Sequence, residues 1–295
     1  NGVVIWIASS AASIPLRCAN RMTRRAVRIC IGQTISSPKG TRNTIKPSGS
    51  ASSAVARGPS TGGTLDASNE ESVTVARGVQ HKYTDTVLLL CNEVCGAYCR
   101  YCFRKRLFMD DNDEVTNDVT EGLRYIADHP EGTNVLLTGG DPLLMSTRRL
   151  VEIFDALRAI PHVRIIRLGS KMPAFDPYRV LNDPGLQAAF RTYSTPQQRL
   201  YLMAHFDHPR ELTDVAIRGV DARIRNGVIC VNQCPLIKGI NDDPAVLAEM
   251  YATLSYIGCT PYYLFQGRPT AGNEPYEVPI VRGWRIFQDA LHRGS

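Results

Sequence analysis

The chain has 295 residues, of which 43% are hydrophobic and 21% are charged, a composition typical of globular proteins. No apolar run approaches the roughly 18 residues of a membrane span, so we expect neither a membrane-spanning segment nor a membrane partner. The nine cysteines come without a secretory signal, and four of them lie in one short cluster, so they do not resemble a disulfide framework. These features predict a reduced, cytoplasmic protein.

The net charge of +6 is unevenly distributed along the chain. Residues 1–65 contain nine Lys or Arg and no Asp or Glu, whereas residues 66–295 contain 25 basic and 28 acidic side chains. The basic segment has no sustained helix or strand period, which predicts a disordered or non-native stretch. A transit peptide or a nucleic-acid-binding arm would also be basic, but the charges are scattered, and we expect no nucleic-acid partner. The core domain is therefore expected at 66–295.

From about Thr84 onwards, apolar runs of strand length alternate with helical patterns. The expected strands are 86–91, 134–138, 163–168, 200–206, 228–233 and 261–265. The expected helices are 117–129, 146–160, a weaker one at 178–190, 211–226, 244–257 and 281–292. Strands this apolar belong to a parallel sheet covered by helices. Six such units form either a doubly wound sheet or an incomplete barrel, and both place their chemistry at the carboxyl ends of the strands.

The expected strand ends carry unusual side chains. In chain order they are the run "CNEVCGAYCRYCFRKR", the turn Gly139-Gly140-Asp141, the pair Ser170-Lys171, and then His205, Gln233 and Arg268. Taken singly, a histidine is more often a satisfied core residue, and a glycine pair is more often an ordinary tight turn. Their shared placement at one edge of the sheet favours a functional site instead.

Cys95, Cys99 and Cys102 have the spacing C-x3-C-x2-C. Thiolates are soft ligands that suit zinc, copper(I) or iron–sulfur clusters. Structural zinc needs four ligands, and Cys91 could supply the fourth, but it ends an apolar strand, where a thiol behaves as a small hydrophobe. Three cysteines on a [4Fe–4S] cluster would leave one iron open to a small molecule. The adjacent run Arg104–Arg106 suits carboxylates and phosphates.

The C-x3-C-x2-C motif after the first strand of a six-unit chain resembles that of the radical S-adenosylmethionine enzymes. The longer run "YCRYCFRKR", with "LLTGGDPL", "AHFDHP" and "VNQCPLIKGIND", is similar to the lysine 2,3-aminomutase family within them. The similarity extends from about Gln80 to the end of the chain. It implies an α/β fold, an incomplete (β/α)6 barrel, in which Cys95, Cys99 and Cys102 hold three irons of a [4Fe–4S] cluster.

The resemblance also implies that the fourth iron binds S-adenosylmethionine. Gly139, Gly140 and Asp141 match the family's glycine-rich turn, which meets the methionyl amino group. His205 and Gln233 match positions that contact the adenosyl part. Reductive cleavage would give a 5′-deoxyadenosyl radical that takes a hydrogen atom from the substrate, with the electron coming from a donor such as flavodoxin or ferredoxin.

In this family the amine of a small amino-acid substrate is held on pyridoxal phosphate while nitrogen migrates between neighbouring carbons, which is an isomerase reaction. The resemblance implies that Arg104 is the arginine of the catalytic site that binds the substrate carboxylate. It places Lys82 and Tyr83, together with His81, in the stretch that meets pyridoxal phosphate. Lys82 replaces an arginine there, which keeps the charge but loses the bidentate fork. Homo-oligomerisation is left open.

The sequence departs from the family at two places. Arg268 stands where lysine aminomutases carry an aspartate that binds the distal ammonium of lysine. An arginine there favours an acidic substrate such as glutamate, unless Arg268 pairs with Glu274.

The family's pyridoxal phosphate lysine lies well downstream of the sixth strand, whereas the last lysine here is Lys238. We therefore expect a C-terminal part to be missing and the activity of this chain alone to be incomplete.

Two alternatives remain beside the aminomutase. One is a radical S-adenosylmethionine enzyme with other chemistry and no pyridoxal phosphate, which the residues of a longer C-terminal part would distinguish. The other is a zinc-stabilised binding protein with no catalytic activity, which metal analysis would distinguish.

Overall fold

The computed structural model describes residues 4–6, 64–109 and 112–293. Most of the basic segment 1–65 lies outside these residues, so its predicted disorder and the domain boundary after it stay predictions. The described residues form a nine-stranded sheet in the order β1-β9-β8-β7-β6-β5-β4-β3-β2. Six of its strands are parallel and follow one another in the chain: β4 (Thr86–Asn92), β5 (Asn134–Gly139), β6 (Ile165–Ser170), β7 (Arg199–Ala204), β8 (Ile229–Leu236) and β9 (Thr260–Gln266).

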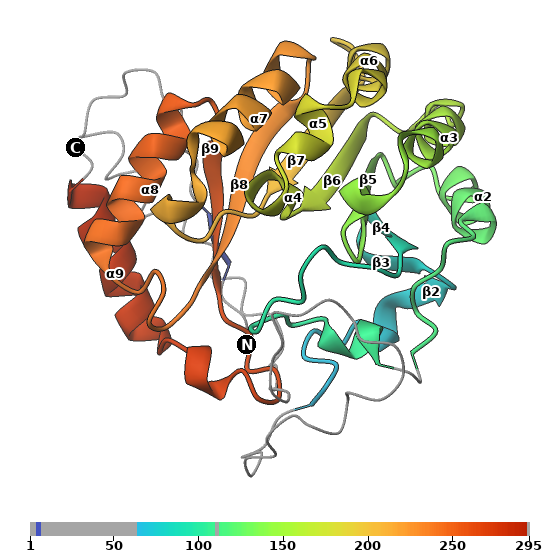
Figure 1. The fold of residues 1–295 in the computed structure, drawn as a ribbon. Coiled ribbons are helices and arrows are strands. Elements are labelled where there is room, and N and C mark those ends of the chain that lie inside the picture. Colours follow the sequence, from blue (N-terminus) through green and yellow to red (C-terminus); the bar gives the residue numbers. More distant parts are fainter. Residues whose placement is uncertain (1–3, 7–63, 110–111, 294–295) are drawn as a thin grey trace.

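The order of the parallel strands distinguishes between the two architectures that the sequence left open. A doubly wound sheet reverses its strand order at a switch point, and its helices cover both faces. Here β4 to β9 are in strict chain order, and the helices form an arc on one outer side of the curved sheet (Figure 1). The strands do not close into a ring, since β4 pairs with β3 and β9 pairs with β1. This order is compatible with an open, barrel-like α/β fold.

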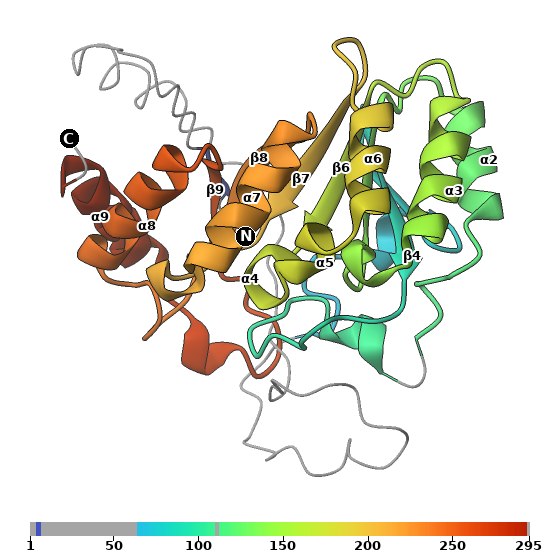
Figure 2. The same ribbon diagram turned by 45° about the horizontal axis from the view of Figure 1, so that its top comes forward.

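Apart from the short α4, which was not expected, the helices lie close to the expected ranges, and they stand side by side over the sheet (Figure 2). They are α2 (Thr120–Asp128), α3 (Thr147–Arg158), α4 (Met172–Phe175), α5 (Tyr178–Leu181), α6 (Pro184–Tyr193), α7 (Asp214–Arg225), α8 (Pro244–Tyr256) and α9 (Ile280–Arg293). Single turns of 3-10 helix lie in the segments between these elements: η2 (Glu71–Val73), η3 (Lys105–Phe108), η4 (Pro142–Leu144), η5 (Pro209–Glu211) and η6 (Glu274–Tyr276).

The weaker helix expected at 178–190 is two helices. Pro184 has no backbone N–H to continue α5, so the chain starts a new helix there. The Asp183 carboxylate accepts a hydrogen bond from the Leu186 backbone nitrogen at 2.8 Å and caps α6. Thr213 and Asp243 cap α7 and α8 in the same way.

Three strands at the two ends of the sheet were not expected from the sequence. β2 (Thr74–Ala76) and β3 (Val79–Tyr83) precede Thr84, where regular structure was expected to begin, and extend the sheet antiparallel beyond β4. β3 reads VQHKY and lacks the apolar run that marks the central strands. β1 (Val4–Trp6) lies within the segment expected to be disordered, and it pairs antiparallel with β9. The outer strand of a sheet has unpaired backbone groups, and a neighbouring segment can pair with them through its own backbone. Such a segment needs no alternation of apolar and polar side chains, so its sequence does not reveal it.

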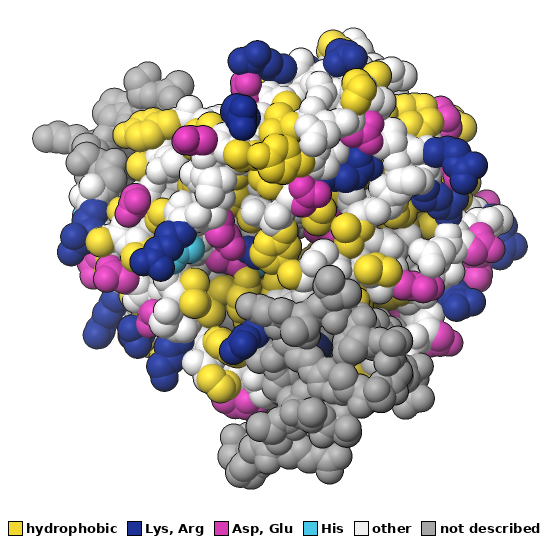
Figure 3. Space-filling view, in the orientation of Figure 1, with side chains coloured by type: hydrophobic (Ala, Val, Ile, Leu, Met, Phe, Trp, Pro, Cys, Tyr) yellow, Lys and Arg dark blue, Asp and Glu magenta, His cyan; other side chains and the backbone are white. Residues whose placement is uncertain are grey.

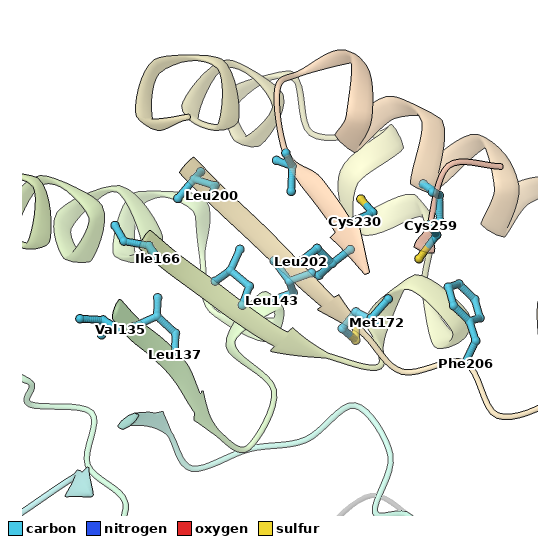
Figure 4. Packing of buried hydrophobic residues seen from close by; sticks show 14 of the residues in the cluster. Val135, Leu137, Leu143, Ile166, Met172, Leu200, Leu202, Phe206, Cys230 and Cys259 are labelled. Carbon is cyan, nitrogen blue, oxygen red and sulfur yellow. The ribbon is translucent and has the colours of Figure 1, made fainter. Parts of the chain in front are cut away.

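The hydrophobic core lies between the sheet and the helices. Leu137 on β5, Ile166 on β6 and Leu202 on β7 are at most 1% exposed and belong to one cluster (Figure 4). Burial of such side chains contributes about 1.5–3 kcal/mol each. This packing holds the parallel strands in register, so their carboxyl ends meet at one edge.

Basic and acidic side chains are interspersed over the face in Figure 3, in keeping with the nearly balanced charge of residues 66–295. Within the part of the chain that the structure describes, no helix combines the length and the apolar character needed to cross a lipid bilayer.

Candidate functional site

The loop that follows β4 carries the three clustered cysteines, and we call residues 93–104 the cysteine loop. Cys95, Cys99 and Cys102 are free thiols of intermediate exposure. The backbone nitrogen of Cys102 donates to the carbonyl oxygen of Cys99 at 3.0 Å, which turns the loop back on itself. The structure therefore brings the three predicted metal ligands to the carboxyl end of the first parallel strand.

The environment of these thiols is unfavourable for isolated thiolates. Burial is the largest effect, and it raises the pKa of Cys99 to about 12 and also raises the pKa values of Cys95 and Cys102. The charges of Cys102, Asp141 and Cys99 raise the pKa of Cys95 further, so the thiols lie within electrostatic reach of one another. Metal binding to such a set requires that the thiols release their protons.

The three cysteine sulfurs are suitable ligands for a soft metal centre, but the structure does not hold them in a metal-binding arrangement. In residues 64–109 and 112–293, no three His, Cys, Asp or Glu side chains are grouped closely enough to hold a metal ion. Cys91 is fully buried in the main hydrophobic cluster, where its Sγ lies 3.8 Å from the Thr138 carbonyl oxygen. It therefore packs in the core, as predicted.

The predicted glycine turn at the end of β5 supports the cysteine loop. Gly139 has φ +110°, and a Cβ there would come within 2.8 Å of the Asn92 carbonyl oxygen. A Cβ on Gly140 would come within 2.8 Å of the Val94 nitrogen and closer still to its carbonyl group. The Gly140 nitrogen instead donates to the Asn92 carbonyl oxygen at 2.6 Å. Only glycine allows the cysteine loop to lie directly against this turn.

Asp141 joins this turn to the next strand end. Its carboxylate accepts hydrogen bonds from Ser170 Oγ at 2.9 Å and from the backbone nitrogens of Lys171 and Leu143 at 2.8 and 3.0 Å. Its carbonyl oxygen accepts one from Asn92 Nδ2 at 2.6 Å. Burial nevertheless raises the pKa of Asp141. The side chain of Asp141, a predicted cofactor residue, thus links the ends of β5 and β6 through hydrogen bonds.

A buried cationic group stands at the ends of β6 and β7. Lys171 Nζ lies 2.7 Å from Asp207 Oδ2 and 2.9 Å from Glu211 Oε1, and Tyr101 of the cysteine loop donates to Asp207. We call these four residues the lysine centre. Burial alone would raise the pKa of Asp207, but the charges of His205 and Lys171 hold it below its usual value. Burial would lower the pKa of Lys171, and Asp207 and Glu211 raise it instead.

The predicted residue His205 borders the lysine centre. Its Nε2 lies 2.9 Å from Asp207 Oδ1, its side chain is 30% exposed, and its carbonyl oxygen accepts a hydrogen bond from Lys171 at 3.0 Å. Its ring lies 6.2 Å from that of Tyr101. Gln233 is half-buried on β8, where it pairs with Tyr263 of β9. His205 is thus near the cysteine loop, whereas Gln233 lies on the next strand along the sheet.

Arg104 lies in a second buried charged group. Its Nε and Nη2 donate to the Glu70 carboxylate at 3.0 and 2.8 Å, and its Nη1 donates to Thr138 Oγ1 at 3.0 Å. Arg106 donates to Glu70 at 3.0 Å and lies 2.6 Å from Glu114. We call Glu70, Arg104, Arg106 and Glu114 the glutamate centre. The predicted substrate arginine is therefore fixed by a carboxylate of the chain itself.

The residues predicted for pyridoxal phosphate separate to two sides of β3. His81 Nδ1 lies 2.8 Å from the Tyr125 hydroxyl on α2, so it faces the helices. Lys82 Nζ donates to the Ser68 carbonyl oxygen at 2.9 Å, and Tyr83 is 57% exposed. Arg268 donates to Ser68 Oγ at 2.7 Å, and no ion pair joins it to Glu274 among the residues that the structure describes.

Sequence reasoning missed Glu70 and Ser68, which precede β2 and hold three of the predicted cations. Their segment reads DASNEES, and it has neither a strand period nor a helix period. A signal was nevertheless present, because Asp66, Glu70 and Glu71 are the first acidic residues of the chain. They follow a stretch without acids and precede an arginine-rich loop.

Several known proteins similar to this chain share one name. A protein of Aquifex aeolicus (strain VF5), provisionally named L-lysine 2,3-aminomutase, is 57% identical over 219 residues, 74% of the chain and 59% of that protein. The L-lysine 2,3-aminomutase of Fusobacterium nucleatum is 36% identical over 225 residues, 76% of the chain and 52% of that protein. That of Clostridium subterminale is 34% identical over 224 residues, 76% of the chain and 52% of that protein. No protein-family model matches the chain.

The chain spans between half and three fifths of the length of these curated relatives.

Proposed function

Because the chain belongs to the lysine 2,3-aminomutase-like family of radical S-adenosylmethionine enzymes, we propose that its whole protein moves an amino group between neighbouring carbons of an amino acid. The observation that carries the proposal is the placement of Cys95, Cys99 and Cys102. They lie on one loop at the carboxyl end of the first parallel strand, against a turn that only glycine permits. Three thiolates are the ligand set for a [4Fe–4S] cluster with one open iron.

The proposal assigns roles to residues of this chain. The cysteine thiolates would hold the cluster, which when bound would supply the electron that cleaves S-adenosylmethionine to a 5′-deoxyadenosyl radical. Gly139 and Gly140 would keep the backbone of the turn close to the methionyl group. His205, bordering the cysteine loop, would contact the adenosyl part. A small reducing protein such as flavodoxin or ferredoxin would be the partner that delivers electrons.

Arg104 and Arg268 would bind and select the amino acid. Arg104 would offer its guanidinium to the substrate carboxylate, with Glu70 fixing its orientation. The charge of Arg268 would repel a distal ammonium, so the proposal favours an acidic amino acid, such as glutamate, over free lysine. Lys82 would hold the phosphate of pyridoxal phosphate.

The test is anaerobic and uses the chain reconstituted with iron and sulfide. After reduction, added S-adenosylmethionine should give 5′-deoxyadenosine, and Cys95→Ala, Cys99→Ala or Cys102→Ala should each abolish it because each removes one ligand. Cys91→Ala is the matched control: its thiol lies in the core, so iron content and 5′-deoxyadenosine should be retained. A protein that binds zinc instead of iron and sulfide, or that loses its metal only in Cys91→Ala, would refute the proposal.

A further inference from the structure

The segment that follows β7 carries His205 and Asp207 on either side of Phe206. Phe206 is completely buried in the core (Figure 4). Its backbone nitrogen donates to Asn232 Oδ1 at 2.8 Å, and its carbonyl oxygen accepts from Asn232 Nδ2 at 3.0 Å. Because Phe206 is fixed in this way, the two flanking side chains are brought to one side, where His205 Nε2 lies 2.9 Å from Asp207 Oδ1.

Asp207 is held in place at its backbone and at one of its carboxylate oxygens. Its backbone nitrogen donates to Glu211 Oε2 at 2.6 Å, and its carbonyl oxygen accepts from Asn241 Nδ2 at 3.0 Å. Its Oδ2 accepts from Lys171 Nζ at 2.7 Å and from the Tyr101 hydroxyl. Oδ1 takes part in none of these contacts. The carboxylate therefore cannot rotate away from the histidine without losing two charged or polar partners.

The remaining oxygen of Asp207 and the inner nitrogen of His205 depend on each other. Both atoms are buried, and within the described ranges neither makes a hydrogen bond to any other group. Burial alone would raise the pKa of Asp207, but the charges of His205 and Lys171 hold it below its usual value. The side chain is therefore a carboxylate, which can only accept hydrogen bonds. It follows that His205 Nε2 carries a proton.

This contact also determines what the outer nitrogen of His205 can do. A neutral imidazole has one N–H and one lone pair, so a proton on Nε2 makes Nδ1 an acceptor. Nδ1 has no hydrogen-bond partner in the part of the chain that the structure describes, and the side chain is 30% exposed. The ring lies 6.2 Å from that of Tyr101, so it borders the cysteine loop. A ligand bound there would meet an acceptor and not a donor.

We propose that Asp207 is a positioning residue for His205. It fixes the ring in the Nε2–H form, and Nδ1 then accepts a hydrogen bond from the adenosyl part of S-adenosylmethionine. That group has suitable donors in its ribose hydroxyls and its adenine amino group. The proposal rests on the proposed function, which brings this ligand to His205. It also gives the lysine centre a role, because Lys171 and Tyr101 keep Asp207 in the orientation that His205 needs.

The test determines which ring nitrogen of His205 carries the proton. Long-range proton–nitrogen NMR spectra are recorded on the full chain with isotopically labelled histidine, without metal or ligand, at a pH at which histidine rings are neutral. His205→Gln assigns the signal by removing it. Wild type should carry the proton on Nε2. A proton on Nδ1 in wild type would overturn the proposal, so the result does not depend on whether any Asp207 variant folds.

Asp207→Asn should move the proton to the other nitrogen. Lys171 and Tyr101 still need an acceptor, so the amide oxygen should stay on their side. The amide NH2 group would then face His205 Nε2, which must become the acceptor, leaving the proton on Nδ1. In the Asp–His pair of serine proteases, the same exchange keeps the geometry but gives the wrong tautomer. An unchanged His205 signal in Asp207→Asn would contradict the proposal.

Two controls show that the change is specific to this pair. His162 is the internal control: its Nε2 lies 2.9 Å from the Ile126 carbonyl oxygen, so it should remain protonated at Nε2 in every variant. Asp214→Asn is the matched variant, because Asp214 is exposed in the first turn of α7. It should leave the His205 signal unchanged.

The second measurement is the affinity of the iron-reconstituted chain for S-adenosylmethionine, by equilibrium dialysis. Asp207→Asn should bind it ~10-fold or more weakly, because two donors would face each other at Nδ1. Iron content should be retained, since the three cysteines are unchanged. A variant with the switched tautomer and wild-type affinity would overturn the proposal. Wild type that fails to bind S-adenosylmethionine would count against the proposed function instead, because the tautomer is measured without cluster or ligand.

Discussion

The two charged centres that contact the cysteine loop have opposite arrangements. In the lysine centre, the ammonium of Lys171 lies between the carboxylates of Asp207 and Glu211. In the glutamate centre, the carboxylate of Glu70 lies between the guanidinium groups of Arg104 and Arg106. Each centre therefore depends on one buried ion that satisfies two partners of the other sign.

The centres also differ in how the chain assembles them. Lys171 and Asp207 follow neighbouring strands, β6 and β7, whose register pairs Ser170 with Ala204 and so brings the two residues together. Glu70 comes from a segment before β2 and outside the repeating strand–helix units. The sheet therefore determines the lysine centre directly, whereas the glutamate centre depends on a separate segment packing onto the site.

The comparison predicts unequal consequences when the central ion is removed. Without Lys171, Asp207 would keep only His205 at ion-pair distance among the described residues. Without Glu70, Arg106 would keep Glu114 and Asp66, at 2.6 and 3.4 Å, and Arg104 would keep the Thr138 hydroxyl, at 3.0 Å. Because a buried charge without a partner is costly, the lysine centre should be the more sensitive of the two.

Lys171→Met is expected to have the largest effect. It leaves two carboxylates facing each other in the interior, which should lower the free energy of unfolding by about 3–5 kcal/mol. Urea unfolding followed by circular dichroism measures the change. Lys238→Met is the control, since Lys238 is exposed, and it should change stability by no more than about 0.5 kcal/mol. If Lys171→Met costs less than about 1 kcal/mol, Lys171 is not the ion on which this centre depends.

Gly140→Ala should have the next largest effect and tests how the two centres are joined. The added Cβ would overlap the Val94 carbonyl group, so the cysteine loop must move away from β5. We expect a loss of about 2–3 kcal/mol in unfolding free energy, together with reduced iron content after reconstitution. Gly169→Ala, where the nearest atom to the new Cβ is 3.7 Å away, should retain both. Full iron content in Gly140→Ala would show that the cysteine loop does not need this close contact.

The strands and helices of this fold were largely predictable because each parallel strand is an uninterrupted apolar run. Val135 and Leu137 on β5 are completely buried, and such burial leaves a clear mark on the sequence. The strand-end rule then located the cysteine loop, Lys171 and His205. β3 was missed because its sequence VQHKY is half-exposed and polar, and β1 was missed because three residues carry too little periodicity.

The partners of the site residues could not be predicted in the same way. Arg104 was expected to face a ligand, yet it lies against Glu70, which is 34 positions earlier in the chain. Asp141 was expected to face a cofactor, yet its carboxylate is taken up by Ser170 and two backbone nitrogens. A motif identifies the residue types that the chemistry needs, but the hydrogen bonds that orient them depend on which distant segments pack nearby.

Glu70→Gln should have the smallest effect and the clearest pH dependence. Burial alone would raise the pKa of Glu70, but Arg104 and Arg106 outweigh it and hold the pKa below its usual value. A lowered pKa contributes stability that is present above the unfolded pKa of about 4.3 and is lost as the pH falls. Glutamine keeps the shape without the charge, so the variant should lose about 1–2 kcal/mol at pH 7.

The difference in unfolding free energy between wild type and Glu70→Gln should therefore shrink as the pH falls from about 5 towards 3, because wild type loses the charge that the variant already lacks. Thermal unfolding across this range measures it. Glu71→Gln is the matched control, since its exposed neighbouring side chain should leave the curve unchanged. A difference that stays constant down to about pH 3 would mean that Glu70 acts through its shape and not its charge. The two centres would then differ in kind, because the lysine centre would be held by ion pairing and the glutamate centre by packing.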